Sequence, residues 1–226
     1  MIITVAKGAL EEYFSFLKIN PYKAYSLYTF VDVKIFNEKA ERKNEISDVF
    51  KLVSVGALRK QKNHKFLLEA FRQLNKKKYQ LDLYGAGPLQ GELEEEIREH
   101  KLNVNLKGEV RNIEKIINQY EVFVMSSTFE GFSLSVLEAM AMGIPLLLSD
   151  IPSFREQCED TAVYFKLNDV IDFKSKLEIM ASGPAVTIDI AKRAQERAVK
   201  NFSLEHHMDG LRKIYTEVLE LYAREK

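Results

Sequence analysis

From about residue 49 onward, short apolar runs alternate with stretches in which apolar residues recur every three or four positions. The stretch 63–77 shows this helical spacing well, because one face of the predicted helix would carry Phe66, Leu67, Ala70, Phe71 and Leu74. The apolar runs predict strands at 49–58, 79–85, 104–108, 121–127, 145–150 and 162–166. The periodic stretches predict helices at 63–77, 88–100, 112–120 and 133–142, and a mostly helical tail from about 169.

This alternation of strand and helix predicts an α/β fold with a doubly wound parallel sheet, Rossmann-like in class. Strands of such a sheet are buried by helices on both faces, which agrees with their continuous apolar character. Ligands of doubly wound sheets bind beyond the carboxyl ends of the strands, where loops lead into helix N-termini. Functional residues are therefore expected in the loops that follow the predicted strands.

The two ends of the chain depart from this rhythm and set the expected domain boundaries. Residues 1–48 suggest a strand at 2–5, a helix at 7–19, a strand at 24–33 and a polar linker at 37–47, and they resemble the last piece of another unit. Residues 49–202 form the expected main domain, and residues 203–226 form a final helix of about six turns. An apolar stripe follows this helix and consists of Leu204, Met208, Leu211, Tyr215, Val218 and Tyr222. We expect the stripe to be partly exposed, packed on residues 1–48, or buried in a self-association through the helix.

The composition narrows the class of protein. Apolar residues make up 46% of the 226 residues, which is enough for a packed core and argues against disorder. Lys and Arg together number 33, as do Asp and Glu, and this balance argues against a nucleic-acid binder. The single cysteine, Cys158, excludes an internal disulfide and a cysteine zinc site, and it fits a reducing cytoplasm. No apolar run is long enough to span a bilayer, and no signal peptide is recognisable.

The loop after the first main strand, GALRKQKNH at residues 56–64, is basic. It carries Arg59, Lys60 and Lys62 just before a predicted helix. One interpretation is a solvated basic loop at the surface. The other is an anion site, because a lysine beside a helix N-terminus adds a full charge to free backbone N–H groups. The loop is not a P-loop, since it lacks the Gly-Lys-Ser/Thr sequence.

Glycines mark the next two loops. Gly85 and Gly87 would permit a tight turn and a close approach to a ligand. A dinucleotide-binding fingerprint needs a further glycine at position 90, where Gln90 stands, so a Rossmann-type dehydrogenase is disfavoured. After the third strand, the turn KGEVRN contains Val110 and Arg111, which either edge a base pocket or form an ordinary strand-to-helix turn.

The stretch FEGFSLSVLEAMAMGIPLLLSD at residues 129–150 isolates two acids, Glu130 and Glu138, in an apolar segment. A structural interpretation makes Glu138 the partner of Ser135 in a capping box and lets Glu130 favour a helix dipole. A functional interpretation uses the same turn into a helix to present backbone N–H groups to a phosphate. Glu138 would then accept two hydrogen bonds from a ribose diol, and Glu130 would accept hydrogen bonds from a sugar.

These motifs, in this order, resemble the nucleotide-sugar-binding half of GT-B glycosyltransferases, particularly the large retaining family 4, or group 1. Glu130 and Glu138 match its Glu-x7-Glu motif, which AMAMGIPLLLSD follows. VSVGALRKQKNH resembles its phosphate loop, LDLYGAGP its Gly-x-Gly-Pro turn, and LKGEV its base-side turn. The matching motifs span residues 49 to about 166. The resemblance implies a two-domain enzyme whose N-terminal acceptor domain would end within residues 1–48.

The resemblance also implies a role for each matching residue. Lys62, with Arg59 nearby, would neutralise the donor diphosphate, and no metal would be required. Glu138 would bind the ribose hydroxyls, and Glu130, as the catalytic residue, would meet the transferred sugar. The nucleotide would contact Gly85, Val110 and Arg111, and its phosphates or the sugar would receive backbone N–H groups from Gly131, Phe132, Ser133 and Leu134. The donor would be a UDP- or GDP-sugar, and no cofactor is expected.

Four positions depart from the family pattern. Ala57 stands where an arginine often follows the glycine, Asn63 replaces a glycine after the lysine, and Thr29-Phe30 replaces Asn-Gly. The implied acceptor is a glycan or a lipid-linked glycan in cell-surface polysaccharide synthesis, at the cytoplasmic side and peripheral to the inner membrane face. Because the acceptor domain would be missing, the chain alone is expected not to transfer sugar. The alternative is a nucleotide-sugar-binding module without turnover.

Overall fold

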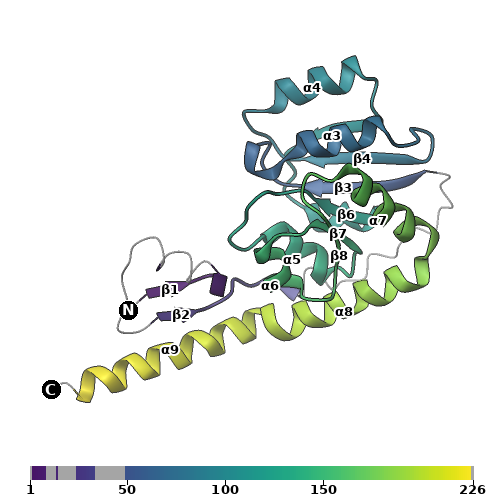
Figure 1. Cartoon of the computed structure of the whole chain (residues 1–226). Coiled ribbons are helices and arrows are strands. Elements are labelled where there is room, and N and C mark those ends of the chain that lie inside the picture. Colours follow the sequence, from purple (N-terminus) through teal and green to yellow (C-terminus); the bar gives the residue numbers. More distant parts are fainter. Residues whose placement is uncertain (1, 9–13, 15–23, 34–48, 225–226) are drawn as a thin grey trace.

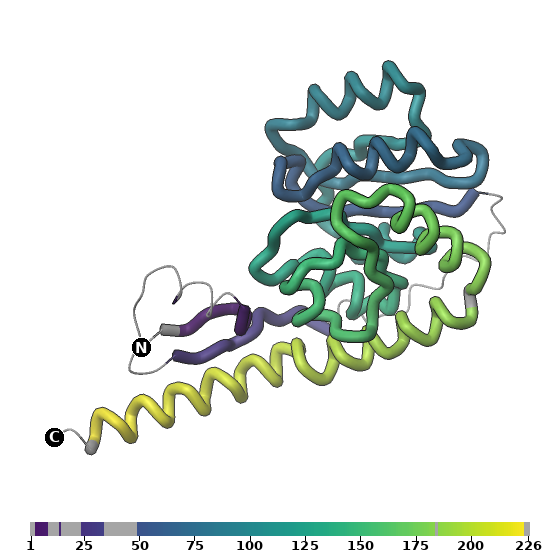
Figure 2. The backbone as a smooth tube through the Cα atoms, viewed as in Figure 1, coloured from purple at the N-terminus to yellow at the C-terminus, as the bar shows by residue number. Residues whose placement is uncertain are grey.

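The computed structural model describes residues 2–8, 14, 24–33 and 49–224 (Figures 1 and 2). In this part of the chain, six strands form one sheet in the order β5-β4-β3-β6-β7-β8. The strands are β3 (Phe50–Val55), β4 (Tyr79–Tyr84), β5 (Val104–Gly108), β6 (Val122–Met125), β7 (Leu146–Ser149) and β8 (Val163–Phe165). Each neighbouring pair is parallel, so the predicted doubly wound parallel sheet is confirmed.

Helices cover both faces of this sheet (Figure 1). Successive side chains of a strand point to opposite faces, and accordingly Leu52 and Val53 of β3 belong to two different buried apolar clusters. The Leu52 cluster includes side chains of α3 (His64–Arg72), α4 (Gln90–Glu99) and α7 (Val170–Ser182). The Val53 cluster includes side chains of α5 (Leu134–Ala141), α6 (Pro152–Cys158) and α8 (Pro184–Phe202).

Two stretches differ from the predicted elements. Residues 112–120 form the 3₁₀ turns η2 (Ile113–Lys115) and η3 (Ile117–Gln119) instead of the predicted α-helix. Isoleucine is β-branched and therefore a weak helix former, and short 3₁₀ turns are common connectors. The sequence pattern also misses α6, a seven-residue helix whose local signal is Pro152 at its start.

The described N-terminal residues form a small sheet apart from the main one. Strand β1 (Ile2–Thr4) pairs in parallel with β2 (Ala24–Ser26), near the first half of α9 (Leu204–Arg224) (Figure 1). Strands are thus confirmed near both positions predicted in this region. Most of the predicted helix at 7–19 and the predicted linker at 37–47 lie outside the described residues.

Helix α9 contacts residues 27–30, which follow β2, through a face beside the predicted apolar stripe. Ile214 is buried, and His207 Nδ1 lies 2.7 Å from the carbonyl oxygen of Tyr28. The exposed members of the predicted stripe are Leu204, Met208, Tyr215 and Tyr222. The expectation of a partly exposed stripe is therefore confirmed for the described residues.

Candidate active site

The loops after four neighbouring strands meet at the carboxyl edge of the sheet, where backbone hydrogen bonds join them. Gly85 N–H donates to Gly108 O at 2.8 Å, which joins the loop after β4 to the end of β5. Thr128 N–H donates to Gln61 O at 2.9 Å, and Gln61 Nε2 donates to Phe129 O at 2.7 Å. These two bonds join the loop after β3 to the loop after β6. The loops singled out in the sequence therefore form one connected surface.

Two glycines allow the loop after β4 to lie directly on the loop after β3. Gly85 has a φ of +135°, and a Cβ added to it would lie 2.1 Å from Gly56 O. A Cβ added to Gly87 would lie 2.6 Å from Leu58 O. Both distances are far below van der Waals contact, so the packing of the two loops requires glycine at these positions. The sequence predicts that these glycines permit a close approach to a ligand. In the structure, it is the backbone of the neighbouring loop that approaches them closely.

A pocket that is open to solvent lies between the loops after β3, β4 and β5. It brings together Gly85, Val110 and Arg111, the three residues proposed from the sequence to contact a nucleotide. Tyr84 and Glu109 line the same pocket, and the sequence motifs do not single them out. A signal for Tyr84 is its place as the last residue of a buried strand, directly before the glycine turn.

A buried hydrogen-bond network fixes Tyr84 behind this pocket. The Tyr84 hydroxyl lies 3.0 Å from the Tyr120 hydroxyl, which donates to the Asp82 carboxylate at 2.6 Å. Asn105 Nδ2 also donates to this carboxylate, at 2.7 Å. Burial alone would raise the pKa of Asp82, but these hydrogen bonds outweigh it and the pKa is lowered. An ionised, well-bonded Asp82 makes this wall of the pocket rigid.

A largely buried ion pair lies at the centre of the site. Lys62 ends the 3₁₀ turn η1 (Lys60–Lys62), and its Nζ lies 2.6 Å from Glu130 Oε1. The side chains are only 18% and 8% exposed, respectively. The Ser127 hydroxyl donates to the same carboxylate oxygen at 2.7 Å. The basic loop is therefore not simply solvated: Lys62 turns inward, whereas Arg59 is exposed.

The start of α5 differs from the capping box considered from the sequence. Ser133 is the N-cap, and its hydroxyl accepts a hydrogen bond from Val136 N–H at 3.5 Å. Ser135 lies inside the helix, so Glu138 occupies the fifth helical position, beyond the reach of a capping box. The capping interpretation of Glu138 is therefore wrong. Glu138 needs another explanation for its place in an apolar segment.

Gln157 of α6 clamps the turn before α5. Its Oε1 accepts from Ser133 N–H at 3.1 Å, and its Nε2 donates to Ser133 O at 2.9 Å. Ser133 N–H is therefore no longer a candidate donor to a phosphate, because it already donates to Gln157 within the protein. In the described part of the chain, no acceptor receives the N–H groups of Gly131, Phe132 or Leu134. These three remain candidate donors to a ligand.

The environment of Glu138 favours its protonated form. Burial and, less strongly, the nearby Glu114 carboxylate raise the pKa of Glu138 from 4.5 to about 7. Glu114 belongs to η2, which follows the turn that contains Val110 and Arg111. The fold therefore disfavours the ionised form of this half-buried acid, as is typical of a carboxylate at a functional site.

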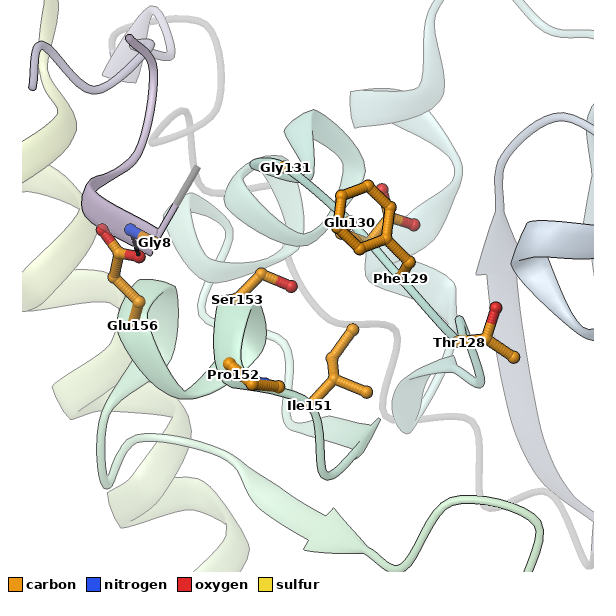
Figure 3. Close-up of a pocket in the computed structure, with 9 residues that line it drawn as sticks. All are labelled: Gly8, Thr128, Phe129, Glu130, Gly131, Ile151, Pro152, Ser153 and Glu156. Carbon is orange, nitrogen blue, oxygen red and sulfur yellow. Dashed lines mark hydrogen bonds between the residues drawn. The ribbon is translucent and has the colours of Figure 1, made fainter. Parts of the chain in front are cut away.

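A second pocket lies beside Glu130 (Figure 3). Its lining residues are Gly8, Thr128, Phe129, Glu130, Gly131, Ile151, Pro152, Ser153 and Glu156. Figure 3 shows Phe129 and Glu130 on one side of the pocket and Gly8 with Glu156 on the other. The sequence motifs predict the Glu130 side but not the side formed by α6 and the N-terminal segment. These two sides are far apart in the sequence, so no spacing within one element could reveal them.

Residues 36–200 match the family model for "Glycosyl transferases group 1". The match covers most of the chain and all the loops of the candidate site that follow the main strands. The chain belongs to this glycosyltransferase family. The family resemblance inferred from the sequence motifs is thereby confirmed.

Curated relatives of this glycosyltransferase chain are longer than the chain itself. It is 34% identical over 152 residues to N-acetylgalactosamine-N,N'-diacetylbacillosaminyl-diphospho-undecaprenol 4-alpha-N-acetylgalactosaminyltransferase of Campylobacter jejuni, which covers 66% of this chain and 41% of that protein. It is 25% identical over 224 residues to UDP-Gal:alpha-D-GlcNAc-diphosphoundecaprenol alpha-1,3-galactosyltransferase of Escherichia coli, covering 90% and 56%. The chain thus spans about half the length of these two relatives.

Solved structures support the fold. A glycosyltransferase from Rickettsia africae superposes with a TM-score of 0.86 at 18% identity, over 96% of this chain and 63% of that one. The Anabaena protein Alr3699/HepE, solved with UDP and glucose, superposes with a TM-score of 0.84 at 17% identity, over the same shares. At these identities the likeness carries the fold, which is that of the Rossmann-like domain of a GT-B fold, as expected from the sequence.

Three further features of this glycosyltransferase chain concern metal binding, a buried histidine and the membrane. Among the described residues, no group of three or more His, Cys, Asp or Glu side chains is arranged to hold a metal ion. His64 is buried, and burial together with the charge of Lys62 lowers its pKa to about 4, so it is neutral at physiological pH. Within the same residues, no helix combines the length and apolar character needed to cross a membrane.

Proposed function

We propose that this chain is the donor-binding half of a retaining glycosyltransferase that uses a nucleotide diphosphate-sugar. The observation that carries the proposal is the largely buried pair of Lys62 and Glu130 at the edge of a pocket. A diphosphate is bound well by a cation, and sugar hydroxyls are bound well by a carboxylate. A surface loop of solvated charges would instead leave both side chains exposed.

In this proposal the nucleotide follows the carboxyl edge of the sheet. The base and ribose occupy the pocket lined by Gly85, Val110 and Arg111, and Glu138 accepts hydrogen bonds from the ribose. The diphosphate lies near Lys62 and the first N–H groups of α5, where the helix dipole favours an anion. Charge that develops on the departing diphosphate is stabilised by the same groups, so the proposed reaction needs no metal.

The transferred sugar enters the pocket that Glu130 lines. Glu130 accepts hydrogen bonds from the sugar there, close to the bond that breaks. The proposal of a retaining outcome rests on the spacing of Glu130 and Glu138, which matches the motif of the retaining family. Glu138 has no capping role that would explain its position, and the pair of Glu130 with Lys62 lies between two loops of the proposed site.

We propose UDP as the nucleotide ahead of GDP, because relatives carry UDP in their names. One is the E. coli galactosyltransferase described above. Another is UDP-N-acetylglucosamine--peptide N-acetylglucosaminyltransferase GtfA subunit of Streptococcus pneumoniae, 36% identical over 107 residues, 46% of this chain and 21% of that protein. The names of the C. jejuni and E. coli relatives contain diphospho-undecaprenol. We therefore propose a lipid-linked glycan as acceptor, in cell-surface polysaccharide synthesis at the cytoplasmic face of the membrane.

A nucleotide-sugar-binding module without turnover is the second candidate. It is favoured by one observation, namely that the chain spans about half the length of its relatives. Both candidates require donor binding, and only the first requires transfer once the remaining part of the enzyme is present. A transfer assay with a polyprenyl diphosphate-linked glycan, on this chain and on a form extended to the length of these relatives, separates them.

Titration calorimetry with UDP, GDP and several UDP-sugars tests the shared part of the proposal. We expect UDP to bind at least about tenfold more tightly than GDP, and a chelator to leave UDP affinity unchanged within about twofold. Preference for GDP would change the nucleotide but keep the site. Absence of all nucleotide binding, or a loss of more than about tenfold with the chelator, would contradict the proposed function.

A further inference from the structure

We propose that Glu156 of α6 is a positioning residue. Its carboxylate holds the N-terminal segment, residues 2–8 and 24–33, against the pocket that Glu130 lines. Three groups of that segment donate to it. Lys7 N–H and Tyr28 O–H donate to Oε1 at 2.6 and 2.9 Å, and Gly8 N–H donates to Oε2 at 3.0 Å. One side chain of the main domain thus fixes two separate parts of the N-terminal segment.

A carboxylate suits this position because all three partners are donors. Lys7 and Gly8 stand at the start of a helical turn, where N–H groups have no acceptor within the helix. A carboxylate offers two acceptor oxygens with several lone pairs, whereas an amide offers one oxygen. Burial, together with the hydrogen bond to Glu156, raises the pKa of Tyr28, so the phenol stays a neutral donor.

Helix α6 is itself held firmly to the main domain. Arg197 of α8 donates to the carbonyl oxygens of Glu156 and Gln157 at 3.1 and 2.9 Å, and it pairs with Glu159 at 2.8 Å. The side chain of Gln157 holds both backbone groups of Ser133. Consecutive residues of α6 therefore hold the N-terminal segment and the turn before α5. A shift of either would be transmitted through a short, well-fixed helix.

The hydrogen bonds to Glu156 hold one wall of the pocket in place. Gly8 lines the pocket opposite Phe129 and Glu130 (Figure 3), and its N–H is one of the groups that Glu156 binds. Glu156 therefore sets how closely the N-terminal segment faces Glu130. Resting on the proposed function, we infer that this wall encloses the donor sugar. Glu156 then contributes to recognition of the sugar, while the nucleotide is bound elsewhere along the sheet edge.

Hydrogen exchange of the unliganded chain tests these hydrogen bonds directly, by comparing Glu156→Gln with wild type. We expect amides of residues 2–8 to exchange about tenfold or more faster in the variant, because charge-assisted hydrogen bonds are lost. Asp160→Asn is the matched control, since Asp160 is an exposed carboxylate just after α6 that pairs with Arg193 of α8 and, among the described residues, with neither Arg197 nor the N-terminal segment. Unchanged exchange in Glu156→Gln, or equal acceleration in Asp160→Asn, would overturn the proposal.

A second variant and a second readout complete the test. If Glu156→Gln does not fold, Tyr28→Phe removes one donor only, and we expect a smaller acceleration, of about threefold or more, at the same amides. Calorimetry should show UDP affinity of Glu156→Gln within about twofold of wild type, and the ratio of UDP-sugar to UDP affinity reduced about fivefold or more. Equal losses for UDP and UDP-sugar would overturn the positioning role. If wild type binds no nucleotide, the proposed function fails, while the exchange result still decides whether Glu156 holds the N-terminal segment.

Discussion

Lys62 Nζ and Glu130 Oε1 lie 2.6 Å apart, and this pair joins the loop after β3 to the loop after β6. Both side chains are mostly withdrawn from solvent, so neither charge is well hydrated if the other leaves. In the proposed function, an arriving diphosphate offers Lys62 a new anionic partner. Glu130 is then released to accept hydrogen bonds from the sugar that follows the diphosphate into the pocket.

Substitution of Lys62 by glutamine should weaken the binding of UDP. A charge-assisted hydrogen bond is worth about 1.5–3 kcal/mol, so we expect a loss of about 10- to 100-fold in affinity, measured by calorimetry. Lys60→Gln is the control, because Lys60 belongs to the same turn but is exposed. Equal losses in the two variants would mean that the loop attracts the anion through its overall charge and that Lys62 has no specific role.

Substitution of Glu130 by glutamine should separate the sugar from the nucleotide. We expect UDP affinity to stay within about threefold, and the additional affinity that the sugar gives a UDP-sugar to fall about tenfold. The reason is that a carboxylate accepts sugar hydroxyls better than an amide does. If UDP and UDP-sugar lose the same factor, Glu130 acts only through its partner Lys62. Thermal melts of the variant should accompany the titrations, since the buried pair is weakened.

Local patterns account for the sheet and for most of the loops of the site. The strand predicted at 49–58 is longer than β3, Phe50–Val55, because the apolar Ala57 and Leu58 extend the run into the loop. Leu58 is fully buried there without being part of a strand. Helix α6 is missed because it is short and buries Gln157 beside two apolar residues, which hides its apolar face.

The contacts that complete the site could not be predicted from spacing. Ser133 and Ser135 are equally good N-cap residues as sequence signals. The choice of Ser133 agrees with its two hydrogen bonds to Gln157, 24 positions away in the chain. The three bonds to Glu156 cross 128 to 149 positions. Periodicity describes one element at a time, and these bonds depend on how elements pack.

The raised pKa of Glu138 predicts a pH-dependent stability. Its folded-state pKa of about 7 lies above the ordinary value of 4.5, so the fold favours the protonated form. The contribution of this group to the free energy of unfolding is fully present below about pH 4.5 and is lost as the pH rises through 7. We expect Glu138→Gln to lack this loss and to melt at a higher temperature than wild type at pH 8. Similar melting curves for both proteins from pH 5 to 8 would contradict the shift.

Donor binding should depend on the same ionisation in the opposite sense. The ribose hydroxyls need an ionised Glu138, so the affinity for a UDP-sugar should rise between pH 6 and 8 as the carboxyl group of pKa about 7 loses its proton. A UDP-sugar is the right probe, because the terminal phosphate of UDP itself titrates near pH 6. Glu138→Gln should bind more weakly at pH 8 and show a flat pH profile. A rise that persists in this variant would assign the titration to another group.

A pair of glycine substitutions tests how tightly the loops after β3 and β4 are packed. Gly85→Ala forces a Cβ to within 2.1 Å of Gly56 O at a φ of +135°, which only glycine adopts readily. Backbone strain and the clash together should lower stability by about 3 kcal/mol or more. In a chain of this size we expect a fall in melting temperature of about 5–10 °C, together with weaker UDP binding, because Gly85 lines the pocket.

Gly91→Ala is the matched control in the next helix. Gly91 lies in the first turn of α4, and a Cβ added there meets no atom within 4 Å. Alanine is the better helix former, so this substitution should raise stability by up to about 1 kcal/mol and leave UDP affinity unchanged. The two substitutions add the same methyl group six positions apart in the chain, so opposite signs in the melts isolate the effect of the loop contact. If Gly85→Ala melts like wild type and binds UDP normally, the loops are not held at the distance described, and the nucleotide pocket does not depend on their contact.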